Sequence, residues 1–309
     1  MVAYQLLWES RCTLTAAALA PSLAHAYSCI FCWLALSFKP VAAVRVQGAD
    51  IDQTAVEPRY SWGYKDLAKP YYRAKCQTGV ILIYGGVMDL YEVMRTTFAA
   101  REFLDESVSD DVLYKILENA RFAPSGGNRQ GWKVITVRDQ DTRAALAPLI
   151  EPTFQRYVAQ VQAGEAPWNT INPTALTEEQ IAAAPIPRPM IEQLCQAPVV
   201  LIVCVDLSVV ASFDSELDRV GVISGGSIYP FVWNILLSAR NEGYGGTLTT
   251  FVGGQEDKLR ELLNIPEHYA FAAMLPIGKP VKQLTKLRRK AVEEFAVLEK
   301  FDGPVLSAN

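Results

Sequence analysis

Histidine is scarce in this 309-residue sequence, which contains two copies, His25 and His268. A metal site made of several histidines and a Ser-His-Asp triad are both excluded after residue 87, because His268 stands alone there. The sequence also lacks a Walker A motif, and no G-x-G-x-x-G follows the first strand that we expect. If the protein is an enzyme, a cofactor is therefore expected to supply its reactive group, and we predict neither a catalytic side chain nor a metal site.

Positive charge does not dominate the sequence, which has 29 Lys and Arg against 33 Asp and Glu, a net charge of -4. A nucleic-acid-binding protein displaces counterions from phosphates with many cationic side chains, so no nucleic-acid partner is expected. Cysteine is also sparse after residue 87, where Cys195 and Cys204 lie in or beside an apolar stretch and are expected to be structural. The pair Cys29-x-x-Cys32 lacks two further ligands at matching spacing, so it does not predict a zinc site.

Composition divides the sequence near residue 87. Residues 1–87 are slightly basic, with eight Lys and Arg against five Asp and Glu, whereas the remainder is acidic. The apolar stretch 13–38 is long enough for a membrane anchor, and Ala24-His25-Ala26 suits signal-peptide cleavage, yet polar interruptions and a start without positive excess weaken both interpretations. We therefore predict an N-terminal extension, 1–87, that is poorly structured or reflects a mis-assigned start, followed by a cytoplasmic domain, 88–309. A signal peptide and an anchor stay alternatives for the extension.

Hydrophobic periodicity and turn residues predict an alternation of helices and strands after Met88. Helices are expected over 88–100, 112–121, 139–150, 224–242 and 255–263, and extended segments over 132–138, 197–205, 247–251 and 269–277. The segment 197–205 is continuously apolar, which is typical of a strand buried on both faces. Six prolines interrupt residues 151–190, which we expect to cross the surface as short irregular pieces and to form a candidate lid.

A polar loop, Ser125-Gly126-Gly127-Asn128-Arg129-Gln130, joins the second expected helix to the first expected strand. A turn needs at most one glycine, so two glycines among Ser, Asn and Gln suggest a backbone that approaches a flat polar ligand closely. Amide side chains can match the pyrimidine edge of a flavin, whereas Ser and Arg suit a ribityl hydroxyl or a phosphate. A plain connecting loop explains the same residues without a ligand, and on chemistry alone it is the favoured interpretation.

Two later segments allow the same pair of interpretations. Gly243-Tyr-Gly-Gly-Thr247 follows an expected helix, and one glycine is enough to cap a helix. The additional glycines would let a cofactor approach the backbone, whose N–H groups could face a flavin N5 or a substrate. The tail segment Lys286-Leu-Arg288-Arg289-Lys290 is the densest cationic cluster of an acidic domain, and it is either a solvated surface or a phosphate site.

In this order and spacing, the segments resemble the FMN-dependent nitroreductase family from Met88 to the end of the chain. The resemblance depends most on Ala123-Pro-Ser-Gly-Gly-Asn-Arg-Gln130. Further agreement comes from Ala100–Phe103, Ser227–Leu236, Gly245–Leu248, and Leu275–Pro280 with Lys286-x-Arg288. The resemblance implies an α+β fold with a central mixed β-sheet wrapped by helices. It also implies an intertwined homodimer, in which each FMN lies at the interface and touches both chains.

The resemblance assigns a role in FMN binding to ten residues. The phosphate would be held by Arg101, Lys286 and Arg288. The ribityl chain and the ring would contact Ser125, Gly126, Asn128 and Gln130, with Ser125 and its neighbours reaching in from the partner chain. The ring near N5 would be lined by Gly245, Gly246 and Thr247. The family often has Arg-x-Ser-x-Arg in the first helix, where this sequence has Thr97-Phe-Ala-Ala-Arg101, so either Arg95 and Thr97 substitute or the phosphate has fewer contacts.

The resemblance finally implies two half-reactions at one pocket. NAD(P)H reduces the flavin and leaves, and a small electron-poor acceptor such as a nitroaromatic or a quinone then takes the electrons. One alternative is a specialised flavin enzyme of the same fold, of the dehalogenase or flavin-cleaving type, with residues 151–190 as a substrate-recognising lid. Another alternative is a flavin-binding module without turnover.

Overall fold

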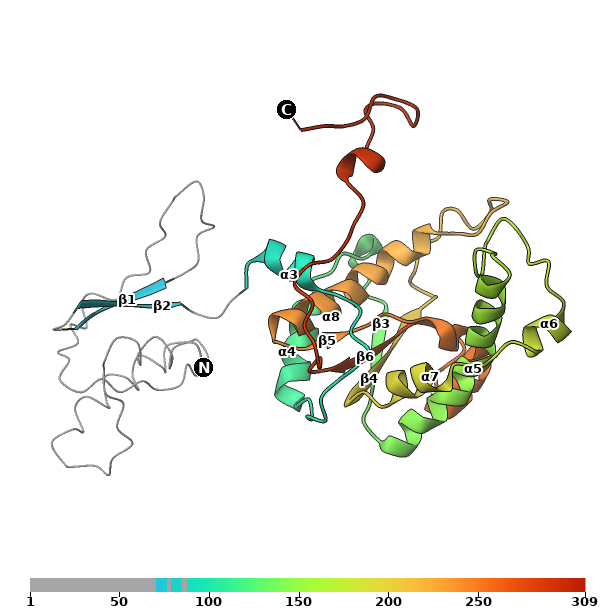
Figure 1. The fold of residues 1–309 in the computed structure, drawn as a ribbon, viewed down its shortest axis with the longest axis horizontal. Coiled ribbons are helices and arrows are strands. Elements are labelled where there is room, and N and C mark those ends of the chain that lie inside the picture. Colours follow the sequence, from blue (N-terminus) through green and yellow to red (C-terminus); the bar gives the residue numbers. More distant parts are fainter. Residues whose placement is uncertain (1–70, 77–78, 85–87, 309) are drawn as a thin grey trace. The chain divides into compact units, whose positions relative to one another are not determined.

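The computed structural model describes residues 71–76, 79–84 and 88–308 (Figure 1). Contacts along the chain divide it into two units, Met1–Asp89 and Leu90–Asn309. In the first unit, strands β1 (Tyr71–Cys76) and β2 (Gly79–Tyr84) pair antiparallel as a hairpin. The apolar stretch 13–38 and the Cys29–Cys32 pair lie outside the described residues, so the interpretations of the N-terminal extension stay predictions.

The second unit contains a four-stranded sheet with the strand order β3-β4-β6-β5. Its strands are β3 (Trp132–Val137), β4 (Val199–Asp206), β5 (Gly245–Gly246) and β6 (Tyr269–Gly278). Neighbouring strands pair antiparallel, and a parallel bridge joins Ala99 to Gly246 at the β5 edge. The expected mixed character of the sheet therefore rests, among the described residues, on that isolated bridge.

Seven α-helices are described in the second unit. They are α3 (Leu90–Thr96), α4 (Asp110–Ala120), α5 (Gln140–Gln162), α6 (Glu178–Ala182), α7 (Arg188–Cys195), α8 (Tyr229–Asn241) and α9 (Glu256–Leu263). Short 3-10 helices occupy Gly126–Asn128, Ile223–Ser227, Phe251–Gln255 and Val292–Glu294. Helix α4 begins directly after Ser109, two residues before the expected start at 112, and the Ser109 hydroxyl accepts a hydrogen bond from the backbone N–H of Val112.

Helices cover both faces of the sheet, as the α+β prediction requires (Figure 1). One core lies between the sheet and helices α4 and α8, and a second lies between the sheet and helices α5, α7 and α9. Strand β4 belongs to both, because Leu201 and Val203 face the first core whereas Ile202 and Cys204 face the second. Residues 199–205 are all buried, which confirms the prediction that this apolar strand is covered on both faces.

The prediction that prolines break the chain at 151–190 was wrong for its first part. Helix α5 continues to Gln162 with Pro148 and Pro152 inside it. Both prolines are exposed, whereas Ile150 and Phe154 of the same helix are buried in the core. Tertiary packing of that apolar face outweighs the hydrogen bonds that the proline nitrogens cannot donate.

Three other expected boundaries differ from the structure. The first expected helix, 88–100, is the shorter α3, because the chain after Thr97 turns to meet Gly246 at the sheet edge. The expected helix 224–242 consists of a 3-10 turn and then α8, which has Pro230 in its first turn. The extended segment expected at 247–251 is reduced to an isolated bridge from Thr249 to Met274, and a 3-10 helix already begins at Phe251.

The remainder of the candidate lid is a loop, 163–176, followed by α6 and α7. The Glu165 carboxylate organises this loop by accepting hydrogen bonds from the Thr174 hydroxyl at 2.6 Å and the Ala175 N–H at 2.8 Å. The Arg156 guanidinium lies over the Trp168 ring, with its Cζ atom 4.6 Å from the ring centroid. In the part of the chain that the structure describes, no helix combines the length and the apolar character that a membrane span needs.

Candidate flavin-binding site

The Ser125–Gln130 loop has an unusual backbone. Gly127, Asn128 and Gln130 all have positive φ, at 61°, 53° and 51°. Asparagine and glutamine pay a conformational cost there that glycine does not, so the surrounding contacts must hold them. The Ser125 hydroxyl supplies one such contact, since it accepts a hydrogen bond from the N–H of Gln130 at 2.9 Å. The loop is therefore a fixed shape with its side chains presented outward.

Two amide side chains of this loop are coupled to each other. Nε2 of Gln130 donates to Oδ1 of Asn128 at 3.1 Å, and both residues are exposed. This bond leaves the amide nitrogen of Asn128 as a donor and the amide oxygen of Gln130 as an acceptor for other groups. A neighbouring donor and acceptor on a rigid support match a ligand edge that alternates acceptors and donors, as the pyrimidine end of a flavin does.

The connection between β4 and α8, residues 207–228, supports the loop at both ends. The hydroxyl of Ser227 accepts a hydrogen bond from the N–H of Gly126 at 3.1 Å. At the other end, Nη1 of Arg129 donates to the carbonyl of Val209 at 3.4 Å. The sequence did not identify Ser227 as a site residue, although a hydroxyl residue two positions before a helix with proline in its first turn was a usable signal.

Gly245 and Gly246 lie in β5 and are buried. A methyl group on Gly246 would lie 2.7 Å from the Pro276 carbonyl oxygen, and one on Gly245 would lie 3.1 Å from the Ala100 side chain. The packing of this chain therefore accounts for both glycines without a ligand. The neighbouring Thr247 is 3% exposed. Contact between these three residues and a cofactor stays a prediction.

The C-terminal tail begins beside Arg101. The backbone N–H of Val281 donates to the carbonyl of Glu102 at 3.1 Å, and Nε2 of Gln283 donates to the carbonyl of Thr96 at 2.9 Å. Arg101 is exposed, and its Nη1 donates to the carbonyl of Ala99 at 3.2 Å. The tail then leaves the body of the unit past α3 (Figure 1). The segment that precedes and follows Arg101 is thus the place where tail, sheet edge and α3 meet.

Lys286 and Arg288 are exposed on that tail. Among the described residues, no hydrogen bond joins either side chain to Arg101 or to the Ser125–Gln130 loop. The hydroxyl of Thr97 donates to the carbonyl of Val93 at 2.7 Å and is buried, so it is already engaged within α3. Whether Arg95 and Thr97 substitute in the altered first-helix motif, or the phosphate has fewer contacts, stays a prediction.

Sheet topology separates the predicted site residues into two groups. The Ser125–Gln130 loop precedes edge strand β3, whereas Gly245 and Gly246 form the opposite edge, β5. Three strand spacings amount to about 14 Å. The two groups also lie at opposite ends of the sheet, because Trp132 pairs with Val205 opposite Ala270, whereas Gly245 pairs with Gly278. Eight residues along β6 add roughly 27 Å. One copy of the chain therefore does not bring the predicted residues together.

The described part of the chain offers no cysteine nucleophile. Burial raises the pKa of the Cys195 and Cys204 thiols to about 11. Both thiols therefore stay protonated near neutral pH, which agrees with the prediction that they are structural.

The sequence model of the Nitroreductase family matches residues 94–279, more than half of the chain. The protein is thus a member of a family of flavin-dependent oxidoreductases. The match covers the Ser125–Gln130 loop, Arg101 and the Gly245–Thr247 segment, and it ends before Lys286 and Arg288. Family membership confirms the resemblance drawn from the sequence.

The relatives that resemble this chain include a reductase and a deiodinase. The chain is 27% identical to the nitrobenzene nitroreductase of Ectopseudomonas oleovorans over 232 residues, 66% of this chain and 94% of that protein. It is 25% identical to the iodotyrosine deiodinase of Nematostella vectensis over 214 residues, 68% of this chain and 75% of that protein. The structure of a BluB-like flavoprotein from Clostridium difficile 630 matches with a TM-score of 0.52 at 21% identity, over 69% of this chain and 100% of that one. This last likeness confirms the α+β nitroreductase fold.

Proposed function

We propose that the protein is an FMN-dependent NAD(P)H oxidoreductase that reduces small electron-poor acceptors such as nitroaromatics or quinones. The observation that carries the proposal is the rigid Ser125–Gln130 loop, which presents an amide donor and an amide acceptor on a backbone held at positive φ. The similarity to a nitrobenzene nitroreductase supports the acceptor class. The choice between NADH and NADPH and a cytoplasmic location stay predictions.

The side chains available at the two groups of residues fit the parts of FMN. Asn128 and Gln130 match the hydrogen-bonding edge of the ring, and the exposed guanidinium of Arg101 matches a phosphate. The separation of the two groups across the sheet means that one chain supplies half of each site. We therefore propose a homodimer in which the Ser125–Gln130 loop of one copy faces Arg101 and Gly245–Thr247 of its partner.

The surface of the C-terminal tail supports this arrangement. Phe295 is 67% exposed and Phe301 is fully exposed on a segment that extends away from the body (Figure 1). On α8, Tyr229 and Trp233 are also more than 40% exposed. Aromatic side chains of this size are normally covered, so an apolar partner surface is expected, and a second copy offers one. The same tail would bring Lys286 and Arg288 to a phosphate.

Bound FMN would supply the two-electron chemistry, accepting electrons from NAD(P)H and passing them to the acceptor. The side chains of this protein would hold and orient the FMN. Asn128 and Gln130 would fix the ring edge, Ser125 and Gly126 would support the ribityl side, and Arg101, Lys286 and Arg288 would neutralise the phosphate. The buried backbone of Gly245, Gly246 and Thr247 would exclude water on the other side of the ring. No acid-base side chain is required.

Spectroscopy of the purified full-length protein tests this proposal. We expect flavin absorbance bands, release of FMN on denaturation, and bleaching of the bands when NADH or NADPH is added without oxygen. Addition of nitrobenzene or a quinone should restore the oxidised spectrum. Bleaching by neither nucleotide would overturn the reductase function and favour a flavin-binding module without turnover.

A second candidate function is reductive dehalogenation. The similarity to an iodotyrosine deiodinase favours it, as does the ordered 163–176 loop, which the Glu165 hydrogen bonds and the Trp168–Arg156 contact hold in place. If this function is the right one, the reduced protein should release iodide from an iodotyrosine faster than it reduces nitrobenzene. Absence of iodide release would leave the nitroaromatic or quinone reductase as the function.

A further inference from the structure

The connection between β4 and α8, residues 207–228, contains a buried carboxylate. Asp214 is 2% exposed. We propose that Asp214 is a positioning residue of the flavin site, which braces this connection so that Ser227 and Val209 hold the Ser125–Gln130 loop in its binding shape. The inference rests on the proposed FMN function and adds a residue that contacts no ligand itself.

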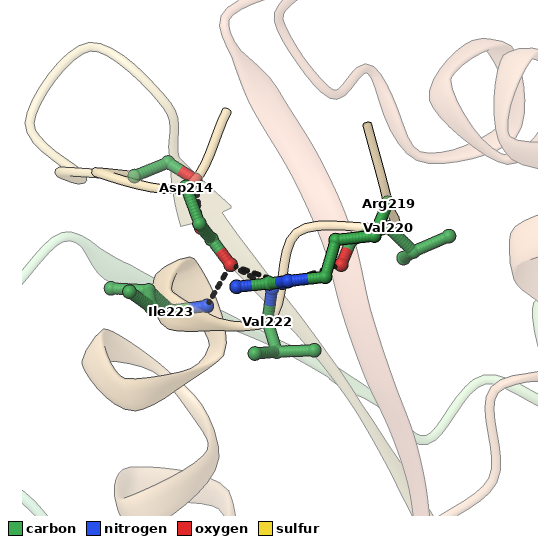
Figure 2. A network of polar contacts seen from close by, with 6 residues as sticks. Asp214, Arg219, Val220, Val222 and Ile223 are labelled. Carbon is green, nitrogen blue, oxygen red and sulfur yellow. Dashed lines mark hydrogen bonds and ion pairs between the residues drawn. The ribbon is translucent and has the colours of Figure 1, made fainter. Parts of the chain in front are cut away.

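The Asp214 side chain collects hydrogen bonds from both sides of its own loop (Figure 2). Oδ2 accepts from the N–H of Val222 at 2.8 Å, from the N–H of Ile223 at 3.4 Å and from Nη1 of Arg219 at 2.8 Å. Oδ1 accepts from the Ser212 hydroxyl at 3.2 Å. The carboxylate therefore ties residue 212 to residues 219–223 and closes the loop on itself.

These bonds fix the start of the 3-10 helix Ile223–Ser227. The N–H groups at the start of a helix lack partners within the helix. A carboxylate placed there accepts their hydrogen bonds, and its negative charge interacts favourably with the helix dipole. Four residues later the same helix ends at Ser227, whose hydroxyl accepts from the N–H of Gly126. The position of that hydroxyl thus depends on where Asp214 places the start of the helix.

The other end of the connection also contacts the Ser125–Gln130 loop. The N–H of Asp206 donates to the carbonyl of Gly131 at 2.8 Å, directly after the loop. Val209 accepts from Arg129, and its side chain would lie 2.7 Å from a methyl group on Gly131. The two ends of the connection are therefore clamped to the two ends of the loop, with Asp214 as the internal tie between them.

Binding of FMN to the flavin-free full-length protein tests the inference. Asp214→Asn removes the charge and turns one acceptor into a donor, and we expect the Kd for FMN to rise at least about fivefold, the lower end of usual coupling between sites. Ser227→Ala should also raise the Kd for FMN. Because Asp214 acts through Ser227, the two effects should not add. The Kd for FMN of the double variant should lie close to that of the single variant with the higher Kd.

Glu165→Gln is the matched control. The Glu165 carboxylate also accepts from a backbone N–H and a hydroxyl within its own loop, and its hydrogen bonds do not involve the Ser125–Gln130 loop. It should lower thermal stability without changing the Kd for FMN. If Asp214→Asn does not fold, Arg219→Met is the substitute, because it removes one hydrogen-bond donor from the same carboxylate. It should also raise the Kd for FMN.

The outcomes separate this inference from the proposed function. Failure of the wild-type protein to bind FMN would overturn the function itself. Tight FMN binding by the wild type, with the folded Asp214 or Arg219 variant within twofold of it, would overturn the role of Asp214 alone. Equal weakening by Glu165→Gln, or fully additive effects of the Asp214 and Ser227 substitutions, would also show that Asp214 acts only on general stability.

Discussion

At the scale of single residues, Gly246 shows how tightly β5 packs on β6. An added methyl group would lie 2.7 Å from the Pro276 carbonyl oxygen and 3.1 Å from the side chains of Leu236 and Ile277. The Pro276 carbonyl is part of the β6 backbone and cannot move without disturbing the sheet, so Gly246→Ala should lower the free energy of unfolding by about 1–3 kcal/mol. Urea unfolding would measure this. Gly226→Ala is the control, since nothing lies within 4 Å of its added methyl group. Equal stability of the two variants would contradict the packing argument.

A second residue-scale prediction concerns acid. The backbone N–H of Val222, followed by the Arg219 side chain, holds the pKa of Asp214 at about 2, below its ordinary value of 3.8. A depressed folded-state pKa means that the unfolded chain takes up the proton first, so the contribution of Asp214 is complete above about pH 5 and is lost as pH falls from about 4 to 2. The melting temperature of Asp214→Asn should therefore lie below that of the wild type at pH 6, by about 5 °C. The difference in melting temperature between the wild type and Asp214→Asn should be smaller at pH 3.

Removal of another carboxylate controls for net charge in that experiment. Glu261 is exposed on α9, and Glu261→Gln should leave the melting temperature unchanged at both pH values. A gap between wild type and Asp214→Asn that is as wide at pH 3 as at pH 6 would show that the charge of Asp214 does not contribute in the way its hydrogen bonds suggest.

The residues of the candidate site differ in how far the sequence could predict them. Ser125, Asn128 and Gln130 stood out because they flank two glycines where a plain turn needs at most one, and the structure places Gly127, Asn128 and Gln130 at positive φ. Asp214 gave no such signal, because a single acidic residue in a loop is usually solvated. Its burial follows from the way that loop folds back on itself, which is a tertiary property.

At the scale of elements, α5 is the instructive case. Periodicity predicted its first half, but Pro152 was expected to end it, because proline lacks the N–H that an interior position donates. Ile150 and Phe154 lie on either side of that proline and are buried in the core, which local sequence rules do not weigh. The strands were predicted well for the opposite reason: β4 and β6 are so apolar that burial could be inferred without knowing their partners.

Pro152 is expected to lower the stability of α5. Its ring is exposed and supplies no packing in the core, so Pro152→Ala restores a helical hydrogen bond at no cost in burial. The free energy of unfolding should rise by about 1–3 kcal/mol, within the range that an interior proline usually costs. Thermal or urea unfolding would measure it, with exposed Ala144→Ser on the same helix as a control of small effect. Unchanged or reduced stability would mean that Pro152 relieves strain elsewhere in α5.

At the scale of the whole molecule, the sheet holds the two groups of predicted site residues apart. The Ser125–Gln130 loop and the Arg101–Gly245 region lie at opposite edges and opposite ends of one sheet. The sequence showed that both were present in the right order, but order along a chain does not state distance in space. In the proposed two-fold dimer, each copy would complete the site of the other with a different surface region.

A heterodimer of two defective chains tests that arrangement directly. Arg101→Glu damages the phosphate side, and Asn128→Gly with Gln130→Gly removes the ring amides while keeping the positive φ that both positions need. Each variant alone should retain little FMN. In a heterodimer purified through two different tags, one site carries both lesions and the other carries none, so FMN content should recover to about half of the wild-type value. If each site were formed within one chain, every site in that heterodimer would carry a lesion and no FMN would return.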